Sequence, residues 1–357
     1  VAGVLIVFMY EKIGRQDGGT NQVLATIKSK DDVPFLSAPL IFVSTLLTHL
    51  TGGSAGREGA SIQFGGSIGN WLGKLAHLDE FDHHVMIMCG MSAAFAAVFG
   101  TPMAAAVFAM EVVSVGVMYY AALLPCVIAS IIAAEFATGM GIDPETFPVH
   151  SIPGLTVETG LKMALIAVGC GILSILFCIL LKTVGQLYTK YLKNPYIRIV
   201  VAAGVIILLT ICLNTKDYMG AGSGLIARAI EKGEARPLDF LWKMLLTALT
   251  MRAGYRGGEI VPAFSIGATF GCVAGGILGF SPELAAAASM VALFCGVTNC
   301  PITAMLISFE LFGFSGAAYY LIAISISYAV SGYYSLYKDQ TIVYSKYKAR
   351  YINRKTR

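Results

Sequence analysis

Long apolar runs alternate with short, broken ones along this chain. Residues 160–181 and 198–213 are almost uncharged and approach the ~20 residues that a helix needs to cross a bilayer core. The apolar stretches at 38–50, 62–76 and 261–279 are each interrupted or bounded by Gly and Pro. Broken helices are tolerated at membrane depth only where protein or a water-filled cavity surrounds them. The pattern therefore predicts a polytopic, all-helical membrane protein with broken helices.

The same order of segments occurs twice. In the first half, a Gly-rich turn with a glutamate opens 57–69, and small-residue helices broken at a Thr-Pro follow at 91–113. In the second half, 257–271 and 289–312 repeat this order about 200 residues later, with a Cys-Pro break. This repetition predicts an internal duplication. Short, interrupted segments at matching places of two halves indicate a transporter whose binding site lies where they meet.

The duplication divides the chain into four parts. Residues 1–140 form the first half, and a polar connector at 141–158 separates it from the second half at 159–345. The basic tail at 346–357 is interpreted as a cytoplasmic, positive-inside end, with a plain solvated terminus as the alternative. Because the chain opens at Val1 inside an apolar helical pattern, we expect N-terminal helices of the first half to precede it.

Composition excludes a soluble domain. Hydrophobic residues make up 56% of the 357 residues and charged residues only 13%, where a soluble domain has about a quarter. The eight cysteines lack CxxC spacing, so we expect small core residues without disulfides and without a metal.

The stretch GGSAGREGA at 52–60 sets a carboxylate, Glu58, among four glycines. Glycines let the backbone approach a ligand closely, and a helix that begins there points its positive end at it. Together these features predict an anion site. Glu58 can fill that site with its own carboxylate, or become protonated and leave it. The alternative is a structural role, either a pair with Arg57 or a helix-start glutamate that complements the dipole.

Four motifs then resemble the CLC family of anion channels and anion/proton antiporters. GREGA followed by SIQFGGSIG is similar to the family signature GREGP-x-x-Q-x-GG-x-x-G, and GGEIVPAFSIGATFG resembles its GGIFxP loop and following helix. GAGSGLI at 220–226 resembles its Gly-rich turn, and Tyr344 in TIVYS falls where the family has its anion-coordinating tyrosine. The match to the fluoride-exporting branch is partial.

The resemblance implies a fold and an assembly. We expect a CLC-type inverted-repeat helical bundle and a homodimer in which each subunit has its own pathway. It would lie in a prokaryotic inner membrane, without the nucleotide-binding CBS domains that other members carry. The transported ions would be chloride or fluoride and protons.

The resemblance also implies roles for single residues. Glu58 would be the gating and proton-carrying glutamate. Tyr344 would coordinate the anion from the inner side, unless it is an interfacial aromatic near the membrane surface. Backbone amides would line the anion site around Gly56, Gly59, Ile260 and Val261.

The first anion loop of the family is not intact here. DGGTNQVLATI occupies its place at 17–27, so Gly18 or Gly19 stands where the family has a serine. Thr20 could replace that hydroxyl, with Asn21 as a second candidate, or both could belong to a plain loop and helix cap.

Two further departures concern glutamates. Alignment by the proline puts Val112 where many CLC antiporters have an internal proton-handling glutamate. Glu111 lies one residue earlier, about 100° around a helix, so we expect it not to fill that role. Glu259 stands where chloride-selective members have an apolar residue and resembles the fluoride branch, whereas Val261 does not. Glu259 could carry protons or bind the anion, or form a structural pair with Arg252 or Arg256.

Other classes of function fit the sequence less well. The five histidines are scattered, and no hydrolase, metalloprotease or nucleotide-binding motif occurs, so we expect no enzyme, no cofactor and no nucleic-acid partner. A transporter of a larger organic anion would need more polar side chains at the broken helices. Proton-coupled halide antiport is the favoured function, and a passive chloride channel is the alternative.

Overall fold

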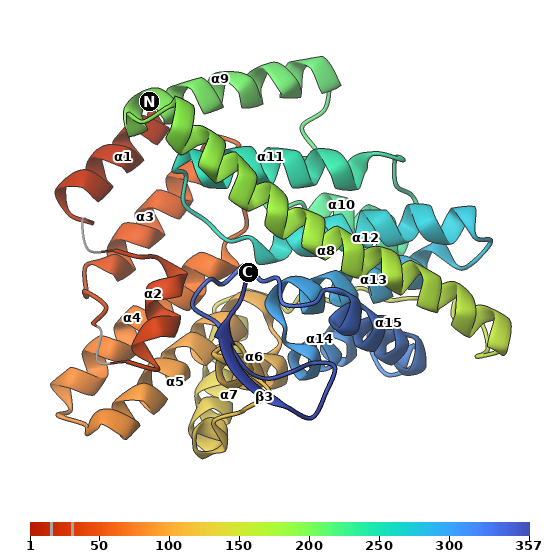
Figure 1. Cartoon of the computed structure of the whole chain (residues 1–357), viewed down its shortest axis with the longest axis horizontal. Helices are drawn as coiled ribbons and strands as arrows, with labels where there is room; N and C mark the ends of the chain where they lie inside the picture. The colour runs from red at the N-terminus through yellow and green to blue at the C-terminus, as the bar shows by residue number, and fades with distance from the viewer. Residues whose placement is uncertain (15–16, 30–31) are drawn as a thin grey trace.

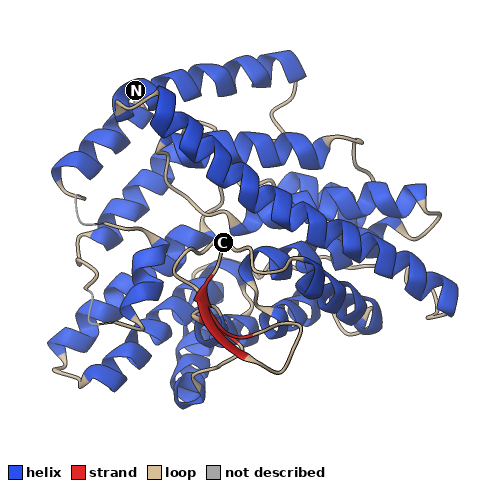
Figure 2. Cartoon of the chain, in the orientation of Figure 1, coloured by secondary structure: helices blue, strands red, loops and turns tan. Residues whose placement is uncertain are grey.

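The computed structural model describes residues 1–14, 17–29 and 32–357 and is mostly helical (Figures 1 and 2). The helices before the connector are α1 (Ala2–Lys12), α2 (Thr20–Thr26), α3 (Ser37–Leu50), α4 (Glu58–Leu75), α5 (Glu80–Phe99), α6 (Pro102–Glu111), η1 (Tyr120–Ala122) and α7 (Leu123–Gly139). Those after it are α8 (Val157–Tyr191), α9 (Pro195–Leu213), α10 (Ser223–Glu231), α11 (Asp239–Ala253), α12 (Ile260–Ile277), α13 (Pro282–Thr298), α14 (Pro301–Phe312) and α15 (Ala317–Val330). The strands are β1 (Ser114–Val115), β2 (Thr341–Tyr344) and β3 (Tyr351–Lys355).

The long apolar runs form helices that can cross a membrane. The predicted runs at 160–181 and 198–213 lie within α8 and α9, and α8 crosses the whole molecule diagonally (Figure 1). The run at 261–279 differs from the prediction, because α12 has 18 residues and is long enough to span. Its apolar window is 72% buried inside the protein. Helix α12 is therefore an interior element, packed by other helices rather than by lipid.

The repeated Thr-Pro and Cys-Pro breaks separate matching helix pairs. Helix α5 ends at Gly100, which has the left-handed conformation (φ 68°), and α6 begins with Pro102 at its first turn. In the second half α13 ends at Asn299, also left-handed (φ 60°), and α14 begins with Pro301. A left-handed residue ends a helix and a proline at N1 starts one without losing a hydrogen bond, so both halves break at the same place for the same reason.

Small residues let the paired helices approach closely. A Cβ added at Gly65 of α4 would lie 2.1 Å from the carbonyl oxygen of Gly90 in α5. In the second half, a Cβ at Gly267 of α12 would lie 2.5 Å from the carbonyl oxygen of Ser289 in α13. Close backbone approach at small residues is the main source of helix–helix packing in membranes.

Two glutamates tie the halves together reciprocally. Glu111, at the end of α6, accepts hydrogen bonds from the backbone N–H of Ile302 (3.0 Å) and from Thr303 N (2.8 Å) and Oγ1 (2.6 Å) at the start of α14. Glu310 in α14 accepts from Met103 N and Ala104 N at the start of α6, both at 2.9 Å. Each carboxylate thus satisfies the free N–H groups of the other half's helix. Glu111 therefore caps α14.

The C-terminal residues form a small sheet that the sequence analysis did not predict. Strand β2 pairs in parallel with β1 and antiparallel with β3 (Figure 2). Residues 351–355 of the predicted basic tail at 346–357 therefore form a paired strand, although the tail has no buried residue. The sheet also joins the two halves, because β1 follows α6 while β2 follows α15.

Candidate functional site

Glu58 opens helix α4 and is buried. Its residue is 1% exposed, and the backbone N–H groups of Glu58 itself, Arg57 and Val261 interact with its carboxylate. Its Oε2 atom has no hydrogen-bond partner among the described residues. Arg57 does not pair with it, because its guanidinium lies 3.6 Å from the carboxylate of Glu145 instead. The Glu58 carboxylate thus occupies a place built from backbone amides, which is where the sequence predicted an anion.

The two Gly-rich turns meet at this carboxylate. Gly56 N donates to Gly258 O at 2.7 Å, and Gly258 N donates back to Gly56 O at 2.5 Å. A Cβ on Gly258 would lie 2.6 Å from Gly59 N and 2.9 Å from Glu58 N, so only glycine fits. Through this bridge the N-termini of α4 and α12 converge, and both bring the positive end of a helix dipole to one point.

Two cavities lie against this junction. The first has a volume of about 200 Å³, and Glu58, Arg57 and Val261 line it. The second has a volume of about 310 Å³, and Gly59, Gly258 and Glu259 line it. Glu58 and its immediate neighbour therefore face two different cavities.

Gly18, Gly19 and Thr20 lie in the wall of the second cavity, but their donors are engaged. Gly18 N donates to Gln22 Oε1 (2.6 Å), Gly19 N to Asp17 Oδ1 (2.8 Å) and Thr20 Oγ1 to Gly59 O (3.0 Å). The Thr20 hydroxyl therefore holds the backbone of α4 in this conformation. Its oxygen lies at the cavity wall, while its proton is directed at Gly59.

Glu259 is the residue just before α12 and lines the second cavity. Its Oε1 lies 2.9 Å from Arg252 Nη2, so the predicted structural pair is formed with Arg252. The other candidate, Arg256, stacks on the ring of Tyr10 at 3.8 Å. Ile260 and Val261 are both buried, and Val261 contributes its N–H to the Glu58 carboxylate.

Tyr344 is not brought to the site. It ends β2, its residue is 48% exposed, and its ring lies 5.8 Å from that of Tyr351. Tyr337, in the loop before β2, is instead 5% exposed and lines the second cavity. It interacts electrostatically with both Glu58 and Glu259. A sequence signal for this was available, because Thr, Ile, Val and Tyr in TIVY favour a strand and so place Tyr344 in the sheet. Tyr337 lies before this strand, in the loop that follows α15.

His49 is a second residue that the sequence analysis did not single out. It lines the first cavity together with Glu58, and its Nε2 is buried without a hydrogen-bond partner in the described parts of the chain. Its position near the end of α3, directly before the Gly-rich turn, brings it to the same cavity as the glutamate.

Comparison with known proteins agrees with this geometry. The family model "Voltage gated chloride channel" matches residues 2–332. A chloride/fluoride channel protein of Pseudomonas syringae pv. tomato is 33% identical over 358 residues, covering 97% of this chain and 78% of the relative. The H(+)/Cl(−) exchange transporter ClcA of Vibrio cholerae is 28% identical over 272 residues, covering 72% of this chain and 58% of the relative.

Among solved structures, the crystal structure of a CLC-type fluoride/proton antiporter superposes with a TM-score of 0.91 at 34% identity, covering 95% of this chain and 86% of the other. Members of this family are channels or transporters rather than enzymes. The predicted all-α inverted-repeat fold is confirmed, and the chain belongs to the voltage gated chloride channel (CLC) family as a chloride/fluoride transport protein of a prokaryotic membrane.

Proposed function

We propose that this chain exchanges fluoride for protons. In this proposal Glu58 carries the proton, and its carboxylate alternates with fluoride at the same site. The observation that carries this proposal is the buried Glu58 carboxylate, held by backbone amides at the partition between two cavities. A carboxylate in an anion site can be replaced by an anion of similar charge. It also has a proton-accepting oxygen, Oε2, that no described residue engages.

The proposed cycle follows from this arrangement. Ionised Glu58 occupies the amide site and separates the cavities. Protonation makes its carboxyl a weaker acceptor of the N–H groups of Arg57 and Val261, so the side chain leaves and a halide takes its place at the same amides. When Glu58 releases the proton to the other side, its carboxylate returns and displaces the halide. One side chain then couples the two fluxes.

Fluoride is proposed as the ion because of the second cavity. Fluoride is a stronger hydrogen-bond acceptor than chloride, and the residues that line this cavity include Tyr337, a residue with a hydroxyl donor, as well as the Arg252–Glu259 pair. The fluoride/proton antiporter similar to this chain over 95% of its length supports the same ion. We also propose a homodimer in the bilayer with one pathway per subunit.

The test uses the protein in liposomes loaded with potassium fluoride or potassium chloride. Anion efflux and external pH are recorded together, before and after addition of a proton ionophore. We expect fluoride efflux accompanied by proton uptake, with each gradient able to drive the other ion uphill. Rapid efflux without proton movement would make the protein a passive channel, and faster chloride than fluoride would overturn the ion assignment.

Two variants make the test specific for Glu58. Glu58→Gln removes the titratable group while keeping the volume, and we expect it to abolish proton movement. Glu145→Gln, which changes a carboxylate at the same cavity that pairs with Arg57, is the matched control and should retain coupled exchange. Unchanged proton coupling in Glu58→Gln would refute the role of Glu58.

A further inference from the structure

Lys243 in α11 is a fully buried lysine that the proposed cycle does not use. It is 0% exposed, and its Nζ donates to Ser54 Oγ (3.0 Å), Tyr218 O (3.1 Å) and Gly220 O (2.7 Å). Three donated hydrogen bonds are the full complement of an ammonium group. All three acceptors are neutral. The ammonium group therefore has all its hydrogen bonds, but none of these partners carries a negative charge to balance it.

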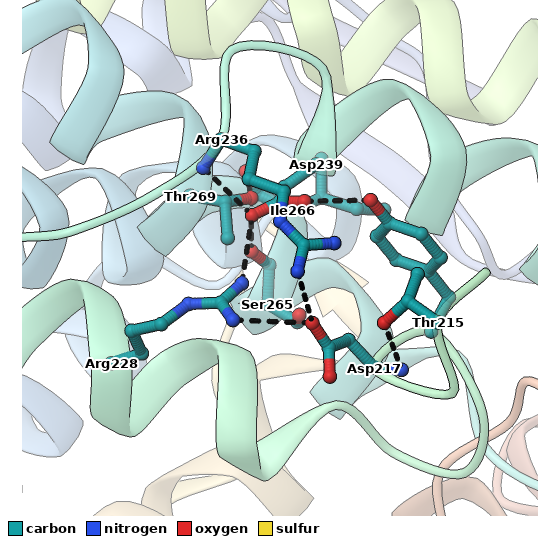
Figure 3. A network of polar contacts seen from close by, with 9 residues as sticks. Thr215, Asp217, Arg228, Arg236, Asp239, Ser265, Ile266 and Thr269 are labelled. Atoms are coloured by element: carbon teal, nitrogen blue, oxygen red, sulfur yellow. Dashed lines mark hydrogen bonds and ion pairs between the residues drawn. The ribbon is translucent and has the colours of Figure 1, made fainter. Parts of the chain in front are cut away.

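The nearest acidic cluster does not balance this charge. Asp239 lies one turn earlier on α11, but its oxygens accept from Arg228 Nη2 (3.0 Å), Tyr218 Oη (2.7 Å) and Arg236 N (2.9 Å). Arg228 also pairs with Asp217 at 3.1 Å, and Figure 3 shows both aspartates joined to both arginines. These two aspartates and two arginines form a neutral set.

No carboxylate within the described ranges lies within 4.0 Å of Lys243 Nζ, and Glu58 is the one with which it interacts electrostatically. The other ionisable groups around it are His49 and Arg57 on the cavity side, with Tyr218 and Asp239 on the other. Arg57 is itself a cation paired with Glu145. The positive charge of Lys243 is therefore balanced by the anion that occupies the Glu58 site.

The ammonium lies directly behind the wall of the first cavity. Ser54 belongs to the Gly-rich turn that leads into Glu58, and Gly220 belongs to the turn before α10, whose neighbours Ala221 and Ser223 line this cavity. At Gly222 (φ 93°) a Cβ would lie 3.0 Å from Lys243 Cε. The turn therefore needs glycine both for its conformation and for the space that the lysine occupies.

We propose that Lys243 is a positioning residue whose buried positive charge requires one anion at the Glu58 site, either the carboxylate or a halide. A buried cation without a counter-charge is costly. When Glu58 is protonated, a halide that enters restores the balance, and when Glu58 is ionised, a second anion is not needed. Lys243 thus links halide entry to protonation of Glu58. This inference rests on the proposed function.

The test measures halide affinity by calorimetry, with potassium fluoride and potassium chloride titrated into the purified protein in detergent at constant ionic strength. Lys243→Gln, which keeps donors but loses the charge, is compared with Lys243→Arg in two backgrounds, natural Glu58 and Glu58→Gln. With Glu58→Gln, we expect Lys243→Gln to weaken fluoride binding roughly tenfold and Lys243→Arg to restore it. With natural Glu58, the expected loss is roughly threefold or less, because the competing carboxylate is weakened as well.

An equal loss of fluoride affinity with natural Glu58 and with Glu58→Gln, or no loss in either, would overturn the inference. A lysine that only holds the turns in place would have the same effect whether or not Glu58 can ionise. If Lys243→Gln does not fold, Ser54→Ala in the Glu58→Gln background decides: it removes one hydrogen bond and keeps the charge. Binding within about threefold supports the charge, and a tenfold loss overturns it. Absence of halide binding with natural Glu58 and with Glu58→Gln would instead sink the proposed function itself.

Discussion

Replacing Glu111 by alanine should be one of the more destabilising single changes in this protein. Its carboxylate accepts from two backbone N–H groups and the Thr303 hydroxyl, at 2.6–3.0 Å, and the residue is 6% exposed. Removal leaves these donors buried without a partner, at about 1–3 kcal/mol each. The hydroxyl can rotate to another acceptor, so we expect a total of about 3–5 kcal/mol.

Glu310→Ala is the matched control, because Glu310 caps α6 as Glu111 caps α14 but is only half-buried. Water can reach the donor at Met103, which is 51% exposed, and we expect a loss of about 1–2 kcal/mol there. Thermal unfolding in detergent, followed by a thiol-reactive dye, reports both variants, since six of the eight cysteines are buried. A Glu111→Ala variant as stable as Glu310→Ala would refute the capping argument.

A second substitution at Glu111 distinguishes a structural role of this residue from a proton-carrying role. Glu111→Gln keeps the shape and one strong acceptor, so it should fold and should retain proton-coupled halide exchange in the liposome assay. Loss of proton movement with preserved halide flux would show that Glu111 carries protons, against the capping interpretation.

Three further outcomes are expected. Tyr337→Phe should reduce halide flux at least severalfold, whereas Tyr344→Phe should leave it unchanged in the same liposomes; the reverse order would contradict the placement of Tyr337 at the cavity. Gly65→Ala should cost about 1–3 kcal/mol or more, because its Cβ would meet the backbone of α5, while Gly204→Ala, which meets nothing within 4 Å, should be neutral or stabilising by melting temperature. Burial lowers the pKa of Lys346 to about 8, below its unfolded value, so the unfolded state binds more protons between these two pKa values. Raising the pH from 8 to 10 should therefore stabilise the natural protein relative to Lys346→Gln by about 2 kcal/mol. An equal change in melting temperature of both proteins between the two pH values would contradict this.

Much of the fold was predictable because membrane helices leave a strong apolar signal. The runs in α8 and α9, the paired Pro breaks and the Gly-rich turns were all visible as local patterns. The bridge between Gly56 and Gly258 was predictable only as a repeated motif, since the hydrogen bonds join residues about 200 positions apart. The partner of each carboxylate could not be predicted from the sequence. Arg57 and Glu58 are adjacent, yet Arg57 pairs with Glu145 while Glu58 lies at backbone amides.

The candidate site was predictable where backbone chemistry decides it and not where side chains converge from distant elements. Glu58 and Val261 were found because glycine turns and helix starts define them. Tyr337 was missed because two tyrosines, Tyr337 and Tyr344, lie close together in the sequence. Only the terminal sheet, which includes Tyr344, decides which of them lines the cavity. Lys243 was missed because a lone lysine in a mostly apolar stretch carries no sequence signal for burial, and only its contacts with Ser54, Tyr218 and Gly220 show where it lies.

The reciprocal caps, together with the Gly56–Gly258 bridge, limit how this protein can move. They fasten the first half to the second at three separate points, and rotation of one half against the other would break all three at once. Rigid-body rocking of one repeat against the other would therefore cost the hydrogen bonds at all three places. If the Glu58 side chain is the moving part, as proposed, the frame around it stays in place during the cycle, and we expect turnover to depend little on bilayer thickness or lateral pressure.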